Sequence, residues 1–226
     1  MSALSLIGEG MIYYSPMNAS IAYRYRGALY LNITNRCPTA CEFCIKRGWD
    51  MRFRGSDLRL GPQEPSVSDI LGAVETERRA SPFSEAVFCG YGEPTCRLPE
   101  LLEVCGELRR LLPGLRLRLN TVGLGDLVNG RPIAPELQGR LDAVRISLNT
   151  ADPAEWARIM RPLPEYRERG FESVLGFIRD CARRIPDTQA TAVERPGADV
   201  EACRRLARTL GAGFAPRAYL DAYEER

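Results

Sequence analysis

Three cysteines lie close together in one short stretch, at Cys37, Cys41 and Cys44. Their spacing is C-x3-C-x2-C, and it follows an apolar run, Ala28 to Thr34, whose residues favour extended structure and predict a buried strand. Three thiolates on one loop can hold three irons of a cubane iron–sulfur cluster, which leaves the fourth iron open to bind another molecule. Phe43, just before the last cysteine, adds an aromatic face beside that open iron.

Two other uses of these cysteines compete with a cluster: a zinc site and simple packing in the core. Structural zinc sites have four ligands, usually as paired C-x2-C units, and the sequence has no further C-x2-C and no histidine. Among the other cysteines, Cys105 and Cys203 fall on apolar stripes of predicted helices and are expected in the core. The spacing therefore favours an iron–sulfur cluster.

A second stretch whose residues could bind a ligand is Gly90 to Thr95, GYGEPT. It directly follows the predicted strand Glu85 to Cys89. Two glycines at the end of a strand let the backbone come close to a ligand. Glu93 supplies a carboxylate, and Pro94 stiffens the exit from the turn. Alone this would be an ordinary turn, but it comes one strand after the cysteine loop.

Polar residues stand at the ends of the next predicted strands. Asn120 ends the third strand, Ser147 and Asn149 end the fourth, and Val193 lies near the end of the fifth. Because the carboxyl ends of parallel strands meet at one rim, we expect these residues to gather at the mouth of a barrel. The alternative for each polar residue is a turn or a helix cap, and the alternative for Val193 is core packing.

Strands and helices alternate along the chain. The predicted strands are Ala28 to Thr34, Glu85 to Cys89, Leu115 to Asn120, Leu141 to Asn149, Thr188 to Glu194 and Gly213 to Leu220. The predicted helices are Ser66 to Ala80, Leu98 to Leu112, one starting at Pro153, Phe171 to Arg184 and one from Val200 to Leu210. Such alternation indicates a parallel sheet with right-handed crossovers.

The predicted fold class is α/β, an open (βα)6 partial TIM barrel with a parallel sheet, because six units are too few for a closed eight-stranded barrel. Ile21 to Tyr25 is a possible extra N-terminal strand. No linker or change of composition divides the chain, so we expect one domain over residues 1–226, with an N-terminal extension at 1–27 and a barrel core at 28–220. The site belongs at the carboxyl ends of the strands.

The cysteine spacing with Phe43, together with the GYGEPT turn, resembles the radical S-adenosylmethionine (SAM) superfamily. More narrowly, the runs YLNITNRC, FCGYGEPT and VEACRRLARTLGAGFAPRAYL are similar to a small family of radical SAM proteins linked to TatD-type nucleases, over most of the chain from Ile21 onward. The resemblance implies two cofactors: a [4Fe–4S] cluster on Cys37, Cys41 and Cys44, and SAM on the open iron. It implies little about the substrate.

The resemblance also implies which residues contact SAM. The turn is similar to the superfamily's Gly-Gly-Glu-Pro motif, whose backbone binds the SAM amino group, although Tyr91 replaces the first glycine and becomes a candidate pocket side chain. In the superfamily, polar strand ends bind the ribose and carboxylate of SAM. The predicted SAM contacts are therefore Phe43, Tyr91, Gly92, Glu93, Asn120, Ser147, Asn149 and Val193.

The chemistry of the superfamily sets the expected function. A reduced cluster passes one electron to SAM, the S–C5′ bond breaks, and a 5′-deoxyadenosyl radical removes a hydrogen atom from a substrate. An external one-electron donor, such as a flavodoxin or a ferredoxin, is implied as a partner. The hard chemistry belongs to the cofactors, and the sequence identifies no catalytic side chain.

The basic residues limit the reaction and suggest the substrate. The chain has no histidine, and of its 31 basic residues one is a lysine, Lys46, and 30 are arginines. Imidazole catalysis and a Ser-His-Asp triad are excluded, and a Schiff base would have to form on Lys46. Two arginine-rich loops, Lys46 to Arg59 and Arg161 to Arg169, are predicted to grip a small anionic substrate. The alternative is that these arginines are solvated surface charges.

Charge and hydropathy argue against a nucleic-acid partner, a membrane span and secretion. The net charge of +2 is too small to favour nucleic acid as a partner. No apolar run is long enough to span a bilayer, and the start MSALSLIGEG is not a signal peptide. With eight cysteines and no export signal, reduced thiols and a cytoplasmic location are expected.

Two other functions remain open at this point. One is an activase that places a radical on a protein partner, or a protein that modifies a peptide. The other is a non-catalytic iron–sulfur protein for electron transfer or sensing. The arginine-rich loops favour a small anionic substrate over a protein partner. The Gly90 to Glu93 turn disfavours an electron carrier, because such a protein needs no SAM pocket.

Overall fold

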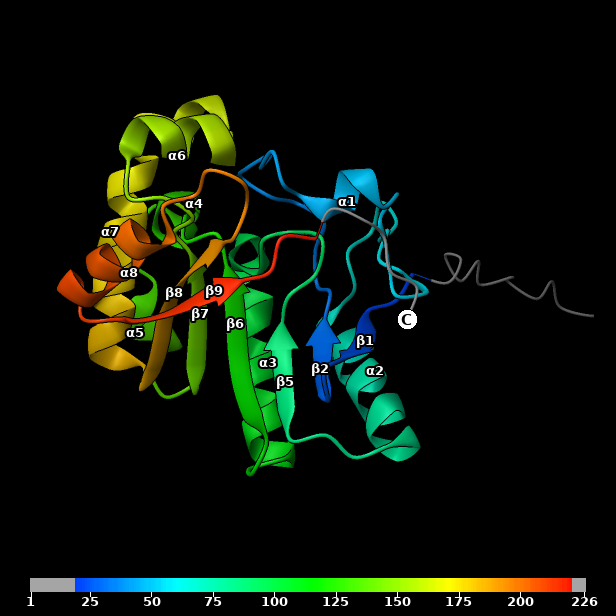
Figure 1. The fold of residues 1–226 in the computed structure, drawn as a ribbon. Helices are drawn as coiled ribbons and strands as arrows, with labels where there is room; N and C mark the ends of the chain where they lie inside the picture. Colours follow the sequence, from blue (N-terminus) through cyan, green and yellow to red (C-terminus); the bar gives the residue numbers. More distant parts are fainter. Residues whose placement is uncertain (1–18, 221–226) are drawn as a thin grey trace, which may run out of the picture.

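A computed structural model describes residues 19–220, so most of the predicted N-terminal extension lies outside the described residues. Its centre is a seven-stranded sheet in the order β1-β2-β5-β6-β7-β8-β9 (Figure 1). The strands are β1 (Ala22–Tyr25), β2 (Ala28–Leu31), β5 (Glu85–Phe88), β6 (Arg116–Thr121), β7 (Ala143–Ser147), β8 (Asp187–Val193) and β9 (Gly213–Arg217). β1 runs antiparallel to β2, and the other neighbouring strands are parallel.

Helices connect the parallel strands and pack against the sheet. The longer helices are α2 (Val67–Ala80), α3 (Leu98–Leu111), α6 (Pro153–Met160), α7 (Gly170–Arg184) and α8 (Val200–Thr209). Shorter helices are α1 (Ile45–Gly48), α4 (Gly125–Asn129), α5 (Ala134–Leu137) and the 3₁₀ turns η1 (Pro94–Arg97) and η2 (Pro164–Tyr166). Within residues 19–220, no helix is long and apolar enough to cross a membrane.

The sheet does not close on itself, because β1 and β9 form its two edges. Six parallel strands with crossover helices confirm the predicted open (βα)6 partial barrel, and β1 confirms the extra N-terminal strand. Beyond β9 the chain runs across the open side of the barrel toward β2 (Figure 1). Leu220 packs there against residues of the opposite edge.

Four strands are shorter than the sequence pattern predicts: β2, β5, β7 and β9. β2 ends at Leu31 rather than at Thr34, and the side chain of Asn32, directly after the strand, donates a hydrogen bond to the Leu58 carbonyl oxygen at 2.9 Å. β7 ends at Ser147 rather than at Asn149, whose φ of 64° is left-handed and incompatible with a strand. After both β2 and β7 an asparagine follows the strand, and its side chain forms a hydrogen bond with a neighbouring segment.

The predicted loop Lys46 to Arg59 holds structure that the sequence did not indicate. It contains α1 and a hairpin of β3 (Arg52–Phe53) and β4 (Ser56–Asp57). The two turn residues, Arg54 and Gly55, have positive φ values of 47° and 80°. Tight hairpin turns require this conformation, but asparagine or aspartate usually occupies the first position, so arginine concealed the turn.

Alternate residues of each strand face opposite sides of the sheet. On the outer side, Leu29, Leu31 and Phe88 belong to the main core beneath the helices. On the concave side of β1, β2 and β5, a second group of buried residues packs around the β3–β4 hairpin. This aromatic cluster consists of Tyr23, Ala28, Tyr30, Trp49, Phe53, Leu58, Val87 and Tyr91. On the concave side of β6 to β9, most residues are polar or charged.

Charged residues line the concave side near the amino ends of β5 to β8. Glu85 pairs with Arg116 at 3.2 Å and with Arg118 at 2.9 Å. Asp187 pairs with Arg116 at 2.5 Å and with Arg145 at 2.8 Å. We call these five residues the ionic floor. Three guanidinium groups share two carboxylates, so the ionic floor has a formal charge of +1.

Asp187 is the member of the ionic floor whose removal gives the clearest test. Burial raises the pKa of its carboxyl, but the hydrogen bond and charge of Arg145 and the charge of Arg116 outweigh burial and hold the pKa below its ordinary value. We expect Asp187→Asn to lower the free energy of unfolding at pH 7 by about 1–3 kcal/mol, because two guanidinium groups lose a charged partner. Urea denaturation measures this change.

The stability lost in Asp187→Asn should be smaller at low pH than at pH 7. A carboxyl with a lowered folded-state pKa stabilises the protein above its unfolded-state pKa, about 3.9 for aspartate, and loses that contribution as pH falls through the folded-state value. The difference from the wild type should therefore narrow below about pH 4. Glu201→Gln removes an exposed pair with Arg204 and serves as control, with an expected change below about 1 kcal/mol. Equal losses in both variants would contradict the role of the ionic floor.

Candidate cofactor site

The three cysteines of the motif lie on one loop that leaves β2 and leads into α1. The Thr39 hydroxyl lies between two of the sulfurs, 3.4 Å from Cys37 Sγ and 3.3 Å from Cys41 Sγ. The Cys44 N–H donates to the Cys41 carbonyl oxygen at 3.1 Å, which curls the chain between them. We call residues 36–44 the cluster loop.

Backbone contacts fasten the cluster loop to the segment at the end of α6. They are the hydrogen bonds Ala40 N–H to Arg161 O at 3.0 Å, Glu42 N–H to Ile159 O at 2.8 Å and Leu163 N–H to Pro38 O at 2.9 Å, with a β-bridge between Thr39 and Pro162. Residues 159–163 therefore support the cluster loop through their backbone. No side-chain pattern in the sequence indicated this role.

The chemistry of the cluster loop fits a cubane cluster. Within residues 19–220, no three His, Cys, Asp or Glu side chains converge on one point where a single metal ion would bind. The thiolates of a cubane stay further apart, because each binds a different iron. Burial raises the pKa of the Cys41 thiol to about 12, and the hydrogen bond from Thr39 only partly opposes this. A thiolate here therefore needs bound cations, which the irons of a cluster supply.

Gly90 and Gly92 let the turn after β5 lie directly against the chain leaving β2. A Cβ on Gly92 would overlap the Thr34 carbonyl oxygen and lie 2.7 Å from that of Arg36. A Cβ on Gly90 would lie 2.8 Å from the Cα of Asn32. The glycines thus have a packing role against the protein's own backbone. The close approach to a ligand that we expected of them stays a prediction.

Glu93 follows the turn and is only 1% exposed. Its carboxylate accepts four hydrogen bonds: from Thr95 N–H at 3.1 Å, Thr95 Oγ1 at 2.8 Å, Thr121 Oγ1 at 2.9 Å and Val122 N–H at 2.6 Å. Burial raises the pKa of this carboxyl, and the four hydrogen bonds oppose the rise. Glu93 therefore joins the exits of β5 and β6. Its predicted contact with SAM stays a prediction.

Tyr91 places its side chain in the aromatic cluster. The residue is 7% exposed, and its hydroxyl donates to the Arg52 carbonyl oxygen at 2.5 Å. The sequence did not indicate this packing role, and a pocket role for the Tyr91 side chain stays a prediction. The Tyr91 carbonyl oxygen accepts a hydrogen bond from Nζ of Lys46 at 3.2 Å. The backbone contact of Tyr91 and Gly92 with SAM stays a prediction.

Asn120, Ser147 and Val193 lie at the carboxyl ends of β6, β7 and β8. Strand alternation places all three on the concave side, opposite the core beneath the helices. The Arg118 Nη1 donates to Asn120 Oδ1 at 2.8 Å, so the ionic floor orients this amide. The structure thus brings these three predicted residues to one rim, and their contact with SAM stays a prediction.

Asn149 has a different setting from the other strand-end residues. It is 2% exposed, its Oδ1 accepts a hydrogen bond from Val193 N–H at 3.0 Å, and its Nδ2 lies 3.2 Å from Met160 Sδ. Met160 Sδ also lies 3.8 Å from Cys41 Sγ. Asn149 and Met160 therefore connect the exits of β7 and β8 to the cluster loop. The contact of Asn149 with SAM stays a prediction.

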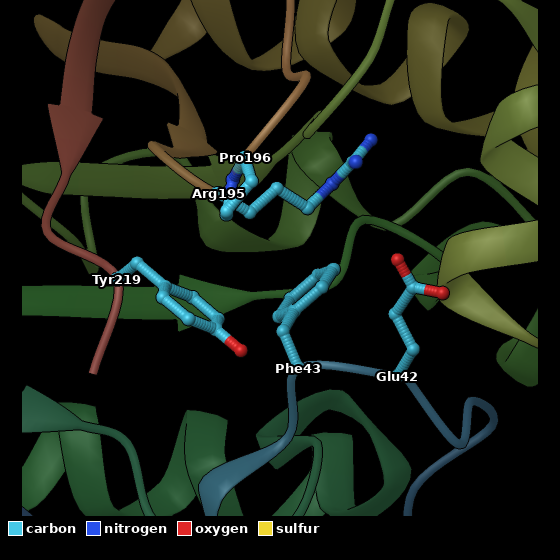
Figure 2. Close-up of a pocket in the computed structure, with 5 residues that line it drawn as sticks. All are labelled: Glu42, Phe43, Arg195, Pro196 and Tyr219. Carbon is cyan, nitrogen blue, oxygen red and sulfur yellow. The ribbon is translucent and has the colours of Figure 1, made fainter. Parts of the chain in front are cut away.

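Phe43 lines a cavity of about 260 Å³ together with Glu42, Arg195, Pro196 and Tyr219. Figure 2 shows the Phe43 ring between Tyr219 and Glu42, with the Arg195 side chain extended across the top of the view. The lining comes from three parts of the chain: the cluster loop, the segment after β8 and the segment after β9. A cavity therefore adjoins the aromatic ring that the sequence singled out.

Arg195 was not singled out by the sequence, although it is central to the charges around this cavity. Its side chain is 9% exposed, and its Nη2 donates to Glu155 Oε1. The Thr150 hydroxyl donates to Glu155 Oε2 at 2.5 Å. Arg158 pairs with Glu42 at 3.1 Å. These contacts link α6 both to the exit of β8 and to the cluster loop.

The arginines of the two predicted substrate loops have other roles in the structure. Arg59 pairs with Asp50 at 2.6 Å, and the Arg54 guanidinium lies 5.3 Å from the centre of the Tyr25 ring. Arg161 supports the cluster loop through its backbone while its side chain is exposed. Capture of an anionic substrate by these two loops stays a prediction.

Comparison with protein families decides the wider assignment. A family model described as the Radical SAM superfamily matches residues 31–210, most of the chain. The chain belongs to the radical SAM superfamily. Members of this superfamily use a [4Fe–4S] cluster and SAM, which confirms the two cofactors predicted from the cysteine loop and the glycine turn.

A curated relative of this radical SAM protein is "Molybdenum cofactor biosynthesis protein 1" from Bos taurus. The two are 27% identical over 175 residues, which is 75% of this chain and 24% of the bovine protein. The chain therefore spans about a quarter of the length of that relative.

Solved structures have the same fold. A radical SAM methyltransferase from Sphaerobacter thermophilus superposes with a TM-score of 0.59 at 12% identity, over 87% of this chain and 68% of that one. HydG, a maturase of the [FeFe]-hydrogenase, gives 0.62 at 13% identity, over 87% and 43%. Methylornithine synthase gives 0.56 at 13% identity, over 85% and 53%. At these identities the likeness concerns the fold alone, and it confirms the open barrel.

We expect Cys37→Ala, Cys41→Ala and Cys44→Ala each to remove most iron and sulfide from the anaerobically reconstituted radical SAM protein, because each thiol is expected to bind one iron. Cys96→Ala is a matched control, since this thiol interacts electrostatically with Cys37 but lies outside the motif. It should keep about four irons per chain. Iron and sulfide assays measure the result. A triple variant that still takes up four irons would overturn the assignment.

Gly92→Ala should lower both iron content and SAM affinity, because the added Cβ overlaps the Thr34 carbonyl oxygen and pushes the turn away from the cluster loop. Gly72→Ala in α2 is the control, since no atom lies within 4 Å of its added Cβ. It should leave both quantities unchanged and stabilise the helix by up to about 1 kcal/mol. Iron assays and equilibrium dialysis with SAM measure the effects. Wild-type iron content and SAM affinity in Gly92→Ala would show that cofactor binding does not depend on this close contact.

Proposed function

We propose that this protein is a radical SAM enzyme that cleaves SAM reductively and uses the resulting radical to remove a hydrogen atom from a small anionic substrate. The observation that carries the proposal is the contact between two motifs at one rim. The Gly90 to Glu93 turn lies against the cluster loop, and the family match covers both segments. A protein that only carried electrons would need no second segment of this kind.

The cofactors supply the bond cleavage. When bound, a reduced [4Fe–4S] cluster and SAM would supply one-electron cleavage of the S–C5′ bond to methionine and a 5′-deoxyadenosyl radical. The residues of the chain bind and orient these groups. Cys37, Cys41 and Cys44 would hold the irons, Phe43 would lie beside the open iron, and the polar ends of β6 and β7 would face the bound SAM.

The chain also supports the exclusion of water from the reaction. A radical needs a site without solvent and without competing hydrogen donors. The aromatic cluster fills the concave side of β1, β2 and β5, and Leu220 packs onto it from the segment that crosses the open side. Removal of a hydrogen atom needs no acid or base, so the absence of histidine is compatible with this function.

The names of the relatives support shared cofactor use and not one shared product. The structural neighbours include a methyltransferase, a maturase and a synthase. The name of the bovine relative concerns molybdenum cofactor biosynthesis, but this chain spans about a quarter of that protein. We therefore propose the common radical chemistry for this chain and assign it no product from its relatives.

Anaerobic incubation of the reconstituted protein with SAM and dithionite tests the proposal. We expect 5′-deoxyadenosine and methionine in equal amounts by liquid chromatography, because one bond cleavage yields both. Cys41→Ala should form neither product, whereas Cys96→Ala should form both. A protein with its full iron content that releases no 5′-deoxyadenosine would refute SAM cleavage and support an electron-transfer or sensing protein. Formation only after addition of a protein partner would support an activase.

A further inference from the structure

Arg217 occupies an unusual position at the mouth of the open barrel. It is the last residue of β9, and the parallel register pairs it with Val193 of β8. Val193 is buried but does not belong to the main core beneath the helices. Residues paired in a parallel register point to the same side of the sheet, so Arg217 faces the concave side.

The charge of Arg217 acts on the thiol at the end of β5. Burial raises the pKa of the Cys89 thiol, and the charge of Arg217 is the largest influence that opposes the rise. Electrostatic influence falls with distance, so the charge of Arg217 acts on the mouth as far as β5, although three strands lie between β5 and β9 in the sheet. The segment that follows Arg217 continues in the same direction until Leu220 packs on the aromatic cluster.

The Arg217 side chain is exposed, and its charge has no partner among residues 19–220. Its side chain makes no ion pair or hydrogen bond there, whereas Arg116, Arg118 and Arg145 below it are all paired. The two carboxylates of the ionic floor are each shared between two arginines. Arg217 and the ionic floor together carry a formal charge of +2 on one concave surface. This concave surface therefore has two more positive than negative charges. Both carboxylates of the ionic floor are already paired with arginines.

We propose that Arg217 binds the carboxylate or phosphate group of the substrate at the mouth of the barrel. This inference rests on the proposed function, and it moves the anion-binding group from the two outer loops to the end of β9. A guanidinium group suits either anion, because it presents paired donors in one plane. The ionic floor beneath adds a long-range attraction for an anion that binds there.

The test measures anion binding to the anaerobically reconstituted protein by titration calorimetry, with inorganic phosphate and malonate as probes. We expect at least one of the two anions to bind the wild type, and Arg217→Gln to weaken that binding about tenfold or more. Arg217→Lys should retain part of the affinity, since lysine keeps the charge but loses the paired donors. Arg205→Gln, an exposed arginine of α8, is the matched control and should change affinity less than about twofold.

Several results would overturn the assignment of Arg217. They are a wild type that binds neither anion, equal weakening by Arg217→Gln and Arg205→Gln, and a loss of SAM affinity in Arg217→Gln that exceeds its loss of anion affinity. The last result would make Arg217 a cofactor contact. SAM cleavage is assayed on the same wild-type sample, so the two proposals are separable. Anion binding through Arg217 without 5′-deoxyadenosine would refute only the proposed function, and cleavage without such binding would refute only this inference.

Discussion

The geometry of the rim depends on a contact that excludes side chains. Chains that leave neighbouring strands normally diverge once the ladder of hydrogen bonds ends. Here the exits of β2 and β5 remain together, because Gly90 and Gly92 have no Cβ and their backbone meets that of residues 32–36. The hydrogen bond from Glu93 N–H to the Arg36 carbonyl oxygen, at 2.7 Å, continues the contact beyond both strands. The start of the cluster loop is thereby fixed relative to the turn.

This contact also explains why a carboxylate lies in the core. The turn directs Glu93 inward, where an isolated charge would cost several kcal/mol. Four donors from the exits of β5 and β6 offset that cost, so the side chain becomes a joint between two strand ends. On the other side, residues 159–163 hold the cluster loop against α6. These protein contacts hold the segments of the rim together at the place where the cofactors would bind.

The sequence predicted what depends on residue type and periodicity. The alternation of strands and helices, the cysteine loop and the open barrel all followed from such patterns, because apolar periodicity and thiol spacing are local properties. The roles of Tyr91 and residues 159–163 did not follow, because they depend on contacts between distant segments. The β3–β4 hairpin was missed for a local reason, since an arginine with positive φ stands where asparagine is usual.

The amino-acid composition counts the arginines but does not show which of them stabilise the fold. Thirty similar charges in a sequence are energetically unequal, because each one's contribution depends on its partner and its exposure. Arg78 and Arg110 form exposed pairs within single helices, where a charge contributes little. Arg97 is 7% exposed and donates to the carbonyl oxygens of Ile33 and Pro65, so it is structural.

The arginines of the ionic floor differ from both the exposed and the structural arginines, because they set the charge of the barrel interior. A barrel interior filled with aliphatic side chains would reject an ion, because desolvation of the ion would not be repaid. Here the carboxylates are outnumbered and each is already shared, so the interior retains a positive potential. The same salt bridges that hold β5 to β8 together thus make the concave side receptive to a negatively charged ligand. In this fold, the same ion pairs stabilise the sheet and give the concave side its positive charge.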